Sequence, residues 1–293
     1  MGFPLFLVLL ALSAVEGIVS ASASAQHAQH SIPSIPQELL ERAVTIRTGV
    51  GAVQEDAGTK SAEAQRFYDQ GLAYLHNFVW IEAARSFNQA LRSDANLALA
   101  HVGLSYAYIE LNQTAKSKQA IATAQTLAAA AGDHIKRHVE ARSLQMAAED
   151  AGGDPARLAA YRKALDGAIA AFPNDAEFLL LRGIAESPDP ADRGQGSVAA
   201  SMPYYERALK ASKHWAARHY LAHAHENGGR MTEAESNAAA YAAQNPGVPH
   251  AVHMHGHELR RLGRINDAIA RFEAADKLQR DYLGREKIGR AHV

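Results

Sequence analysis

A spacing of 34 residues recurs along this chain and constrains its fold more than any other feature. Four small or aromatic residues reappear 34 positions later: Gly71, Tyr74, Phe87 and Ala90 are followed by Ser105, Tyr108, Ile121 and Ala124. The same spacing links Gly229, Ala234 and Tyr241 to Gly263, Ala268 and Ala275. A fixed period of this length indicates an array of stacked structural repeats, in which each unit shares its core with its neighbours.

Amphipathic, alanine-rich segments fill the chain between Ser61 and Glu286. They are about 12 to 16 residues long, which is typical of paired α-helices, and the alternation typical of strands is nearly absent. Short breaks such as Pro173-Asn174-Asp175 and Asn245-Pro246-Gly247 separate them. We therefore predict an all-α solenoid of about five to six helix pairs over residues 61–286.

The repeat resembles that of the tetratricopeptide-repeat (TPR) family over about three quarters of the chain. The matching positions in the first and last repeats are Gly71, Tyr74, Trp80, Ala83, Phe87 and Ala90, and Gly263, Ile265, Ala268, Phe272 and Ala275. The resemblance implies a right-handed α-solenoid of TPR-like helix pairs with a concave inner surface as the binding face. A small residue in each first helix should let its partner approach closely, and a large one should fill the space between pairs.

One middle repeat departs from this pattern, because residues 187–201 (SPDPADRGQGSVAAS) separate its two helices, near Gly183 and Tyr205. We interpret this segment as a surface insertion tolerated at a helix turn. A functional loop is the alternative.

The two ends of the chain differ from the repeats. Residues 1–25 contain the apolar run FPLFLVLLALSAV and end in Ala23-Ser24-Ala25, which is typical of a signal peptide, although no basic residue precedes the run. We therefore expect export to the periplasm or secretion, with an N-terminal anchor or a misplaced start codon as alternatives. Residues 26–60 are polar and predict a leader that packs on the first repeat. Residues 287–293 end in IGRAHV, which resembles a translated sequencing adapter, so we interpret them as a non-native tail.

Charge and composition exclude several classes of function. The chain has 30 basic and 31 acidic residues, so no overall positive field attracts nucleic acid. Cysteine is absent, which excludes disulfides, thiol nucleophiles and thiolate metal sites. No later segment is long and apolar enough to cross a bilayer, so we expect no transmembrane segment in the mature chain. The unusual feature is 15 histidines against 8 phenylalanines.

The histidines concentrate in the last two repeats. In the segment HAVHMHGH, three of them lie within about 60° on a helix that turns about 100° per residue: His250, His253 and His257. They should point away from the core, and His255 should turn inward, because the opposite face is apolar: Ala251, Val252, Leu259 and Leu262.

One repeat earlier, His219 and His223 form an i, i+4 pair that lies 34 residues before His253 and His257. Both pairs should therefore face one groove between helices about 8 to 10 Å apart, and imidazoles can bridge that distance through one ion at about 2.0 to 2.1 Å per bond. This pattern predicts a zinc or copper site formed by His219, His223, His253 and His257. Glu226 could be an outer partner or an additional ligand.

Protein recognition is the other interpretation of these side chains, and a purely structural network is a third. The surface that would bind a protein or peptide comprises His219, His223, Glu226, His250, His253 and His257. The segment also resembles a subgroup of exported bacterial repeat proteins that carry His-x-x-His-Met-x-x-His before Arg-Leu-Gly, which implies the fold but no reaction. We read His76 and His101 as ordinary packing residues.

Motifs for an enzyme are not recognisable: the chain has no nucleophile elbow, no serine-lysine motif and no phosphate loop after a strand. We predict an exported scaffold that binds a partner through its groove, with metal binding as the alternative. In a third possibility the activity resides in natural sequence beyond Glu286, which this part of the chain would only dock.

Overall fold

The computed structural model describes residues 35–186, 198–212 and 214–288. The predicted signal peptide (1–25) therefore lies outside the described residues, as do most of the insertion at 187–201 and most of the tail at 287–293. The helices and contacts below all belong to the unit that begins at Pro33. None of the described helices is both long and apolar enough to span a bilayer.

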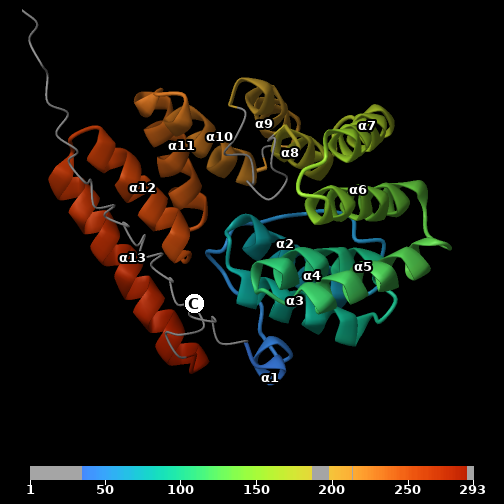
Figure 1. The fold of residues 1–293 in the computed structure, drawn as a ribbon. Coiled ribbons are helices and arrows are strands. Elements are labelled where there is room, and N and C mark those ends of the chain that lie inside the picture. The colour runs from blue at the N-terminus through green and yellow to red at the C-terminus, as the bar shows by residue number, and fades with distance from the viewer. Residues whose placement is uncertain (1–34, 187–197, 213, 289–293) are drawn as a thin grey trace, which may run out of the picture. The chain divides into compact units, whose positions relative to one another are not determined.

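Thirteen helices and no strands occur among the described residues, which confirms the predicted all-α class. The leader contributes the short helix α1 (Gln37–Leu40), and the other helices pack as six successive pairs (Figure 1). The pairs are α2 (Ala62–His76) with α3 (Trp80–Ser93), α4 (Ala98–Glu110) with α5 (Thr114–Ala128), α6 (Asp133–Asp150) with α7 (Pro155–Ala171), α8 (Ala176–Ile184) with α9 (Val198–Ser212), α10 (Ala216–Asn227) with α11 (Met231–Gln244), and α12 (Pro249–Arg261) with α13 (Ile265–Glu286). Each pair also packs on the next, as expected of a solenoid of TPR-like helix pairs.

A glycine in a first helix faces an aromatic ring of a second helix in three of these pairs. A Cβ atom on Gly71 would lie 2.6 Å from the ring of Phe87, and one on Gly103 in the next pair would lie 2.3 Å from the same ring. Tyr205 meets Gly183 at 2.3 Å and Phe272 meets Gly256 at 2.7 Å in the same way. The absence of a side chain thus lets the helices approach, as the repeat pattern predicts.

The turns between helices explain part of the 34-residue spacing. Gly229 and Gly263 end equivalent first helices with φ of 73° and 75°, a left-handed conformation that glycine adopts without steric cost. Asp154 and Asp175 cap α7 and α8 by accepting a hydrogen bond from the backbone N–H three residues later. Local turn chemistry therefore agrees with the repeat.

Residues 35–60 of the leader contact both the first and the last helix pairs. The Oε1 atom of Gln70 accepts the backbone N–H of Arg47 at 2.7 Å, which fixes the leader on α2. The backbone N–H of Gly247 donates to the carbonyl of Gly49 at 2.8 Å, next to α12. At the end of α13, Glu286 forms an ion pair with the buried Arg85 of α3 at 2.8 Å.

Candidate functional site

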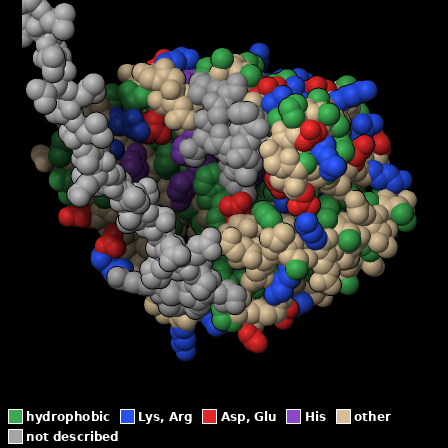
Figure 2. Space-filling model, in the orientation of Figure 1, with side chains coloured by type: hydrophobic (Ala, Val, Ile, Leu, Met, Phe, Trp, Pro, Cys, Tyr) green, Lys and Arg blue, Asp and Glu red, His purple; other side chains and the backbone are tan. Residues whose placement is uncertain are grey.

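Three imidazoles from two adjacent first helices converge on one point. His219 and His223 lie one turn apart on α10, and His250 lies in the first turn of α12. The Nε2 atom of His219 is 3.0 Å from Nε2 of His250 and 3.2 Å from Nε2 of His223. We call these three residues the histidine triad. Histidine side chains also gather in a hollow on the face of the molecule seen in Figure 2.

Hydrogen bonding and burial keep the triad neutral. Nδ1 of His219 lies 2.7 Å from the carbonyl oxygen of His76, which can only accept, so Nδ1 carries the proton and Nε2 keeps its lone pair. Burial lowers the pKa of His219 and His223, and burial, together with the repulsion that a protonated His223 would exert, lowers the pKa of His250 to about 3. The triad therefore offers neutral imidazole nitrogens, the form that binds metal ions.

Aromatic rings fix the orientation of the central imidazole. The ring of His219 is fully buried and stacks on Tyr241, with centroids 4.6 Å apart and an interplanar angle of 9°. Phe78 packs against it with a centroid distance of 4.7 Å, and also lies 5.3 Å from the ring of His250. These contacts restrict rotation, so the site is preorganised.

His253 and His257 do not join the triad, although the 34-residue spacing groups them with His219 and His223. Their Nε2 atoms lie 2.8 Å from each other on the more exposed side of α12, where both rings contact Phe272. The structure places His250 beside His219 instead. Glu226 lies 3.9 Å from Nδ1 of His223, and its other carboxylate oxygen accepts from Arg261 at 2.6 Å.

The face of α12 opposite His250, His253 and His257 is mostly as predicted. His255 turns inward and pairs with Glu235 at 3.2 Å, and the expected apolar residues are buried, with one exception. Leu262 is 38% exposed. The prediction that Leu262 packs against a neighbour is wrong, because α12 ends at Arg261 and the following residues turn into α13.

A second cluster, which the sequence analysis did not identify, joins four residues from three parts of the chain. His134 and His138 lie one turn apart on α6, with Nε2 atoms 3.3 Å apart. Asp175, the N-cap of α8, accepts from Nε2 of His134 at 2.6 Å, and Glu55 of the leader lies 3.3 Å from the same nitrogen. We call these four residues the mixed cluster. Their ligand atoms all lie within 4.8 Å of one another.

Burial and hydrogen bonds shift the pKa values in the mixed cluster in opposite directions. Hydrogen bonds to Asp175 and Glu55 raise the pKa of His134 to about 10. Burial opposes ionisation of Asp175, but hydrogen bonds from His134 and His138 hold the pKa of Asp175 well below its usual range. Burial raises the pKa of Glu55. Without a metal ion, the proton on His134 therefore compensates the buried carboxylate charge.

A third cluster contains His76, Glu177 and His214. Nε2 of His76 lies 3.0 Å from Oε1 of Glu177, and Nδ1 of His76 lies 3.1 Å from the hydroxyl of Tyr220. His214 approaches the same carboxylate oxygen at 3.2 Å. His76 therefore has an acidic partner 101 residues away, and its interpretation as an ordinary packing residue is incomplete.

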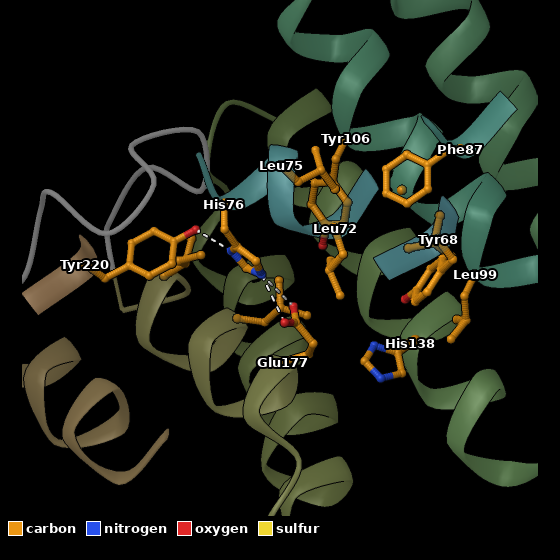
Figure 3. Close-up of a pocket in the computed structure, with 14 residues that line it drawn as sticks. Tyr68, Leu72, Leu75, His76, Phe87, Leu99, Tyr106, His138, Glu177 and Tyr220 are labelled. Carbon is orange, nitrogen blue, oxygen red and sulfur yellow. Dashed lines mark hydrogen bonds and ion pairs between the residues drawn. The ribbon is translucent and has the colours of Figure 1, made fainter. Parts of the chain in front are cut away.

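A pocket lies between the mixed cluster and the third cluster (Figure 3). It encloses about 670 Å³ of atom-free space, including its open mouth, and most of its wall is apolar, including Leu72, Leu99 and Phe87. His76 points between Tyr220 and Glu177 on one side, and His138 lies on another (Figure 3). The pocket thus borders on ionisable groups from two clusters.

The sequence contains one signal for the missed residues. His134 and His138 have the same i, i+4 spacing as His219 and His223, so their shared face on α6 could have been predicted. Glu55 and Asp175 belong to a leader and a helix break, where no periodicity indicates a common site.

No protein-family profile and no curated protein sequence matches the chain. Several solved structures resemble it weakly. PilW, a type IV pilus biogenesis factor, has 16% identity and a TM-score of 0.39, and the match covers 79% of this chain and 97% of PilW. A double mutant of MamA from RS-1 has 13% identity and a TM-score of 0.38, with coverage of 76% and 98%. MamA from MSR-1 has 15% identity and a TM-score of 0.35, with coverage of 76% and 99%.

The similarity to PilW and MamA is too low to indicate a function for this chain. The assignment of the fold rests on the chain's own 34-residue spacing, its six successive helix pairs and the glycine–aromatic contacts between helices. On that evidence, this chain folds as an α-solenoid of TPR-like helix pairs.

Proposed function

We propose that this protein is an exported repeat scaffold that binds a zinc or copper ion at His219, His223 and His250. The observation that carries the proposal is the convergence of three neutral imidazoles, in which Nε2 of His219 lies within hydrogen-bonding distance of Nε2 of both His223 and His250. Nε2 of His219 has one lone pair and faces two other Nε2 atoms, so a hydrogen bond can satisfy only one of these contacts. A cation accepts all three lone pairs at once.

The distances also fit a metal site. Two nitrogen ligands about 2.0 to 2.1 Å from a tetrahedral zinc ion lie about 3.3 to 3.4 Å apart. The observed separations of 3.0 and 3.2 Å reach that value with small rotations of the rings. The Nδ1–H of His219 donates to a backbone carbonyl, a second interaction that metal-binding histidines usually have.

Three imidazole ligands leave a coordination position for water or for a ligand from a partner molecule. Such an open position is typical of sites that exchange their metal or use it chemically, whereas structural zinc sites are closed by four protein ligands. We propose binding and delivery of the metal as the role, and Glu226 as the outer partner of His223. Export follows from the signal peptide predicted in residues 1–25.

Calorimetric titration tests the proposal. The protein is purified without an affinity tag, freed of metal with a chelator and titrated with Zn²⁺ and with Cu²⁺. The variant His223→Ala/His250→Ala should lose one equivalent of bound metal. The matched variant His253→Ala/His257→Ala removes two histidines from the same region and should keep it. If the second variant also loses the metal, the site predicted from the repeat spacing, which shares His223 with the triad, is correct and the triad alone is not the site.

Partner recognition is the second candidate function, and the surface of α12 and α13 favours it. The exposed large hydrophobic side chains of the described residues all lie here: Leu262, Ile265 and Ile269, at 38%, 50% and 48% exposure. Clustered apolar exposure indicates an interaction surface. We expect this surface to bind a protein or peptide of the cell envelope. Wild type and the control Glu273→Ala should both capture that partner, whereas Ile265→Asp/Ile269→Asp should not. Equal capture by all three proteins would contradict this candidate.

A further inference from the structure

The mixed cluster combines two imidazoles with two carboxylates in a largely buried position. The side chains of Asp175, His138 and Glu55 are 6%, 7% and 12% exposed, and that of His134 is 22% exposed. Two carboxylates and two neutral imidazoles balance the charge of a divalent cation. Nitrogen and oxygen ligands in this ratio suit zinc, manganese(II) and iron(II).

We propose that Glu55, His134, His138 and Asp175 form a second divalent-metal site, with two nitrogen and two oxygen ligands. The residues belong to the leader, α6 and the N-cap of α8, and none of them is part of the histidine triad. The proposal therefore stands on observations separate from those behind the proposed function.

The helix geometry places the two nitrogens correctly. An i, i+4 spacing on α6 turns both Nε2 atoms toward the same point, 3.3 Å apart, close to the roughly 3.3 to 3.4 Å expected around a tetrahedral ion. The separation between His134 Nε2 and Glu55 Oε1 is also 3.3 Å, and that between His138 Nε2 and Asp175 Oδ2 is 3.7 Å. Of these four contacts, the 2.6 Å one between His134 and Asp175 is too short, and it is a hydrogen bond that the ion would replace.

Neighbouring contacts hold the ligands in place. Oδ1 of Asp175 accepts the backbone N–H of Phe178 at 2.9 Å as the cap of α8, which leaves Oδ2 directed at the two histidines. The ring of His138 stacks on Phe178, with centroids 4.0 Å apart and an interplanar angle of 18°. His134 packs edge-on against Phe172 at 5.0 Å. Fixed ligand orientation lowers the cost of binding an ion.

An ion bound at this site would affect the stability of the folded protein and the neighbouring pocket. Glu55 comes from the leader, so a bound ion would join residues 35–60 to α6 and α8 and stabilise the folded protein in proportion to its affinity. His138 also lines the pocket of Figure 3, so the ion would lie beside that pocket. Neither consequence follows from the histidine triad.

Titrations of the full metal-free chain with Zn²⁺ and Mn²⁺ test the proposal, with bound Mn²⁺ measured by electron paramagnetic resonance. The variant Glu55→Gln/Asp175→Asn keeps the volume of both side chains, and asparagine can still cap α8. Wild type should bind two zinc ions and one manganese ion. Glu55→Gln/Asp175→Asn should bind one zinc ion, and its manganese affinity should fall at least about tenfold.

The variant His223→Ala/His250→Ala separates the two sites. It should also bind one zinc ion, but it should keep its manganese ion, because the mixed cluster is intact. If Glu55→Gln/Asp175→Asn binds both metals like wild type, or if wild type binds no manganese, the mixed cluster is only a buried ion pair and the proposal is overturned. Loss of zinc in the other variant would then still support the histidine triad, so the two proposals fail independently.

Anomalous diffraction from wild-type crystals soaked in Zn²⁺ provides a readout that does not depend on the folding of a variant. The proposal requires a peak between Oδ2 of Asp175 and the Nε2 atoms of His134 and His138. A soaked crystal with a peak only at the histidine triad would overturn it.

Discussion

Replacing Gly103 with alanine should destabilise the array, although alanine is the better helix former. The added Cβ would lie 2.3 Å from Cζ and 2.4 Å from Cε2 of Phe87, whereas non-bonded carbon atoms normally stay about 3.5 to 4.0 Å apart. The Phe87 ring is fully buried and also packs closely on Gly71, where an added Cβ would lie 2.6 Å from Cε1, so the ring has little room to move away. Two helix pairs must therefore separate, or the ring must leave its rotamer.

The expected magnitude follows from two opposing terms. Alanine gains about 1 kcal/mol over glycine within a helix. Overpacking of a filled core costs about 1 to 3 kcal/mol, occasionally more, and a contact more than about 1 Å too short belongs at the upper end of that range. We therefore expect Gly103→Ala to lower the free energy of unfolding by about 1 to 2 kcal/mol.

Urea denaturation followed by circular dichroism checks this value. Gly284→Ala in α13 is the matched control, because its Cβ would meet no atom within 4 Å, and it should raise stability by about 0.5 to 1 kcal/mol. Combining Gly103→Ala with Phe87→Leu should remove the penalty, so the two changes should be non-additive by roughly 2 kcal/mol. If Gly103→Ala is as stable as wild type, or if the double variant is additive, the packing argument is refuted.

Three further predictions concern buried polar groups. Burial raises the pKa of Glu258 from 4.5 to about 7, so the free energy of unfolding of wild type should fall as pH rises between these values. Glu258→Gln should therefore raise the free energy of unfolding by up to about 3 kcal/mol at pH 8 and change it little at pH 4. The exposed Glu273→Gln is the control and should not give this gain at pH 8. Asn77 bonds Val50, Ala73, Asn245 and Tyr241 from a fully buried position, so thermal unfolding of Asn77→Ala should show a loss of about 2 to 4 kcal/mol. Arg85→Ala leaves the buried Glu82 without its ion-pair partner and Glu286 with only the more exposed Arg47 and Arg285, and should cost about 3 to 5 kcal/mol in a urea titration. By contrast, breaking the exposed Lys277–Asp281 pair should leave stability nearly unchanged.

The fold could be predicted from the sequence because its determinants are local and repeated. Gly71 and Phe87 contact each other within one helix pair, and the 34-residue repeat predicts the same kind of contact in other pairs. Reliance on this local pattern also explains the wrong prediction for Leu262. The apolar periodicity of the sequence continues to Leu262, but α12 ends at Arg261. Periodicity describes the interior of an element and says little about its last turn.

The histidine triad could be predicted only in part. The i, i+4 pair of His219 and His223 is a property of one helix and follows from the sequence. The third member depends on the axial offset between α10 and α12, which a 34-residue period does not contain. That offset brings His250, 31 residues after His219, into contact, and leaves His253 on the more exposed side.

The mixed cluster follows the same construction as the triad, and this shared construction is the physical link between the fold and its candidate metal sites. In both, a first helix presents an i, i+4 imidazole pair, and the start of the next first helix supplies a further ligand: Asp175 at the N-cap of α8, and His250 in the first turn of α12. The ligand follows the first histidine of its pair by 41 residues in one case and 31 in the other, so no fixed period finds it. His253 and His257 form a third such pair, but no first helix follows α12 among the described residues. With two ligands rather than three, that pair should hold an ion weakly, which is why its removal serves as the control for the triad.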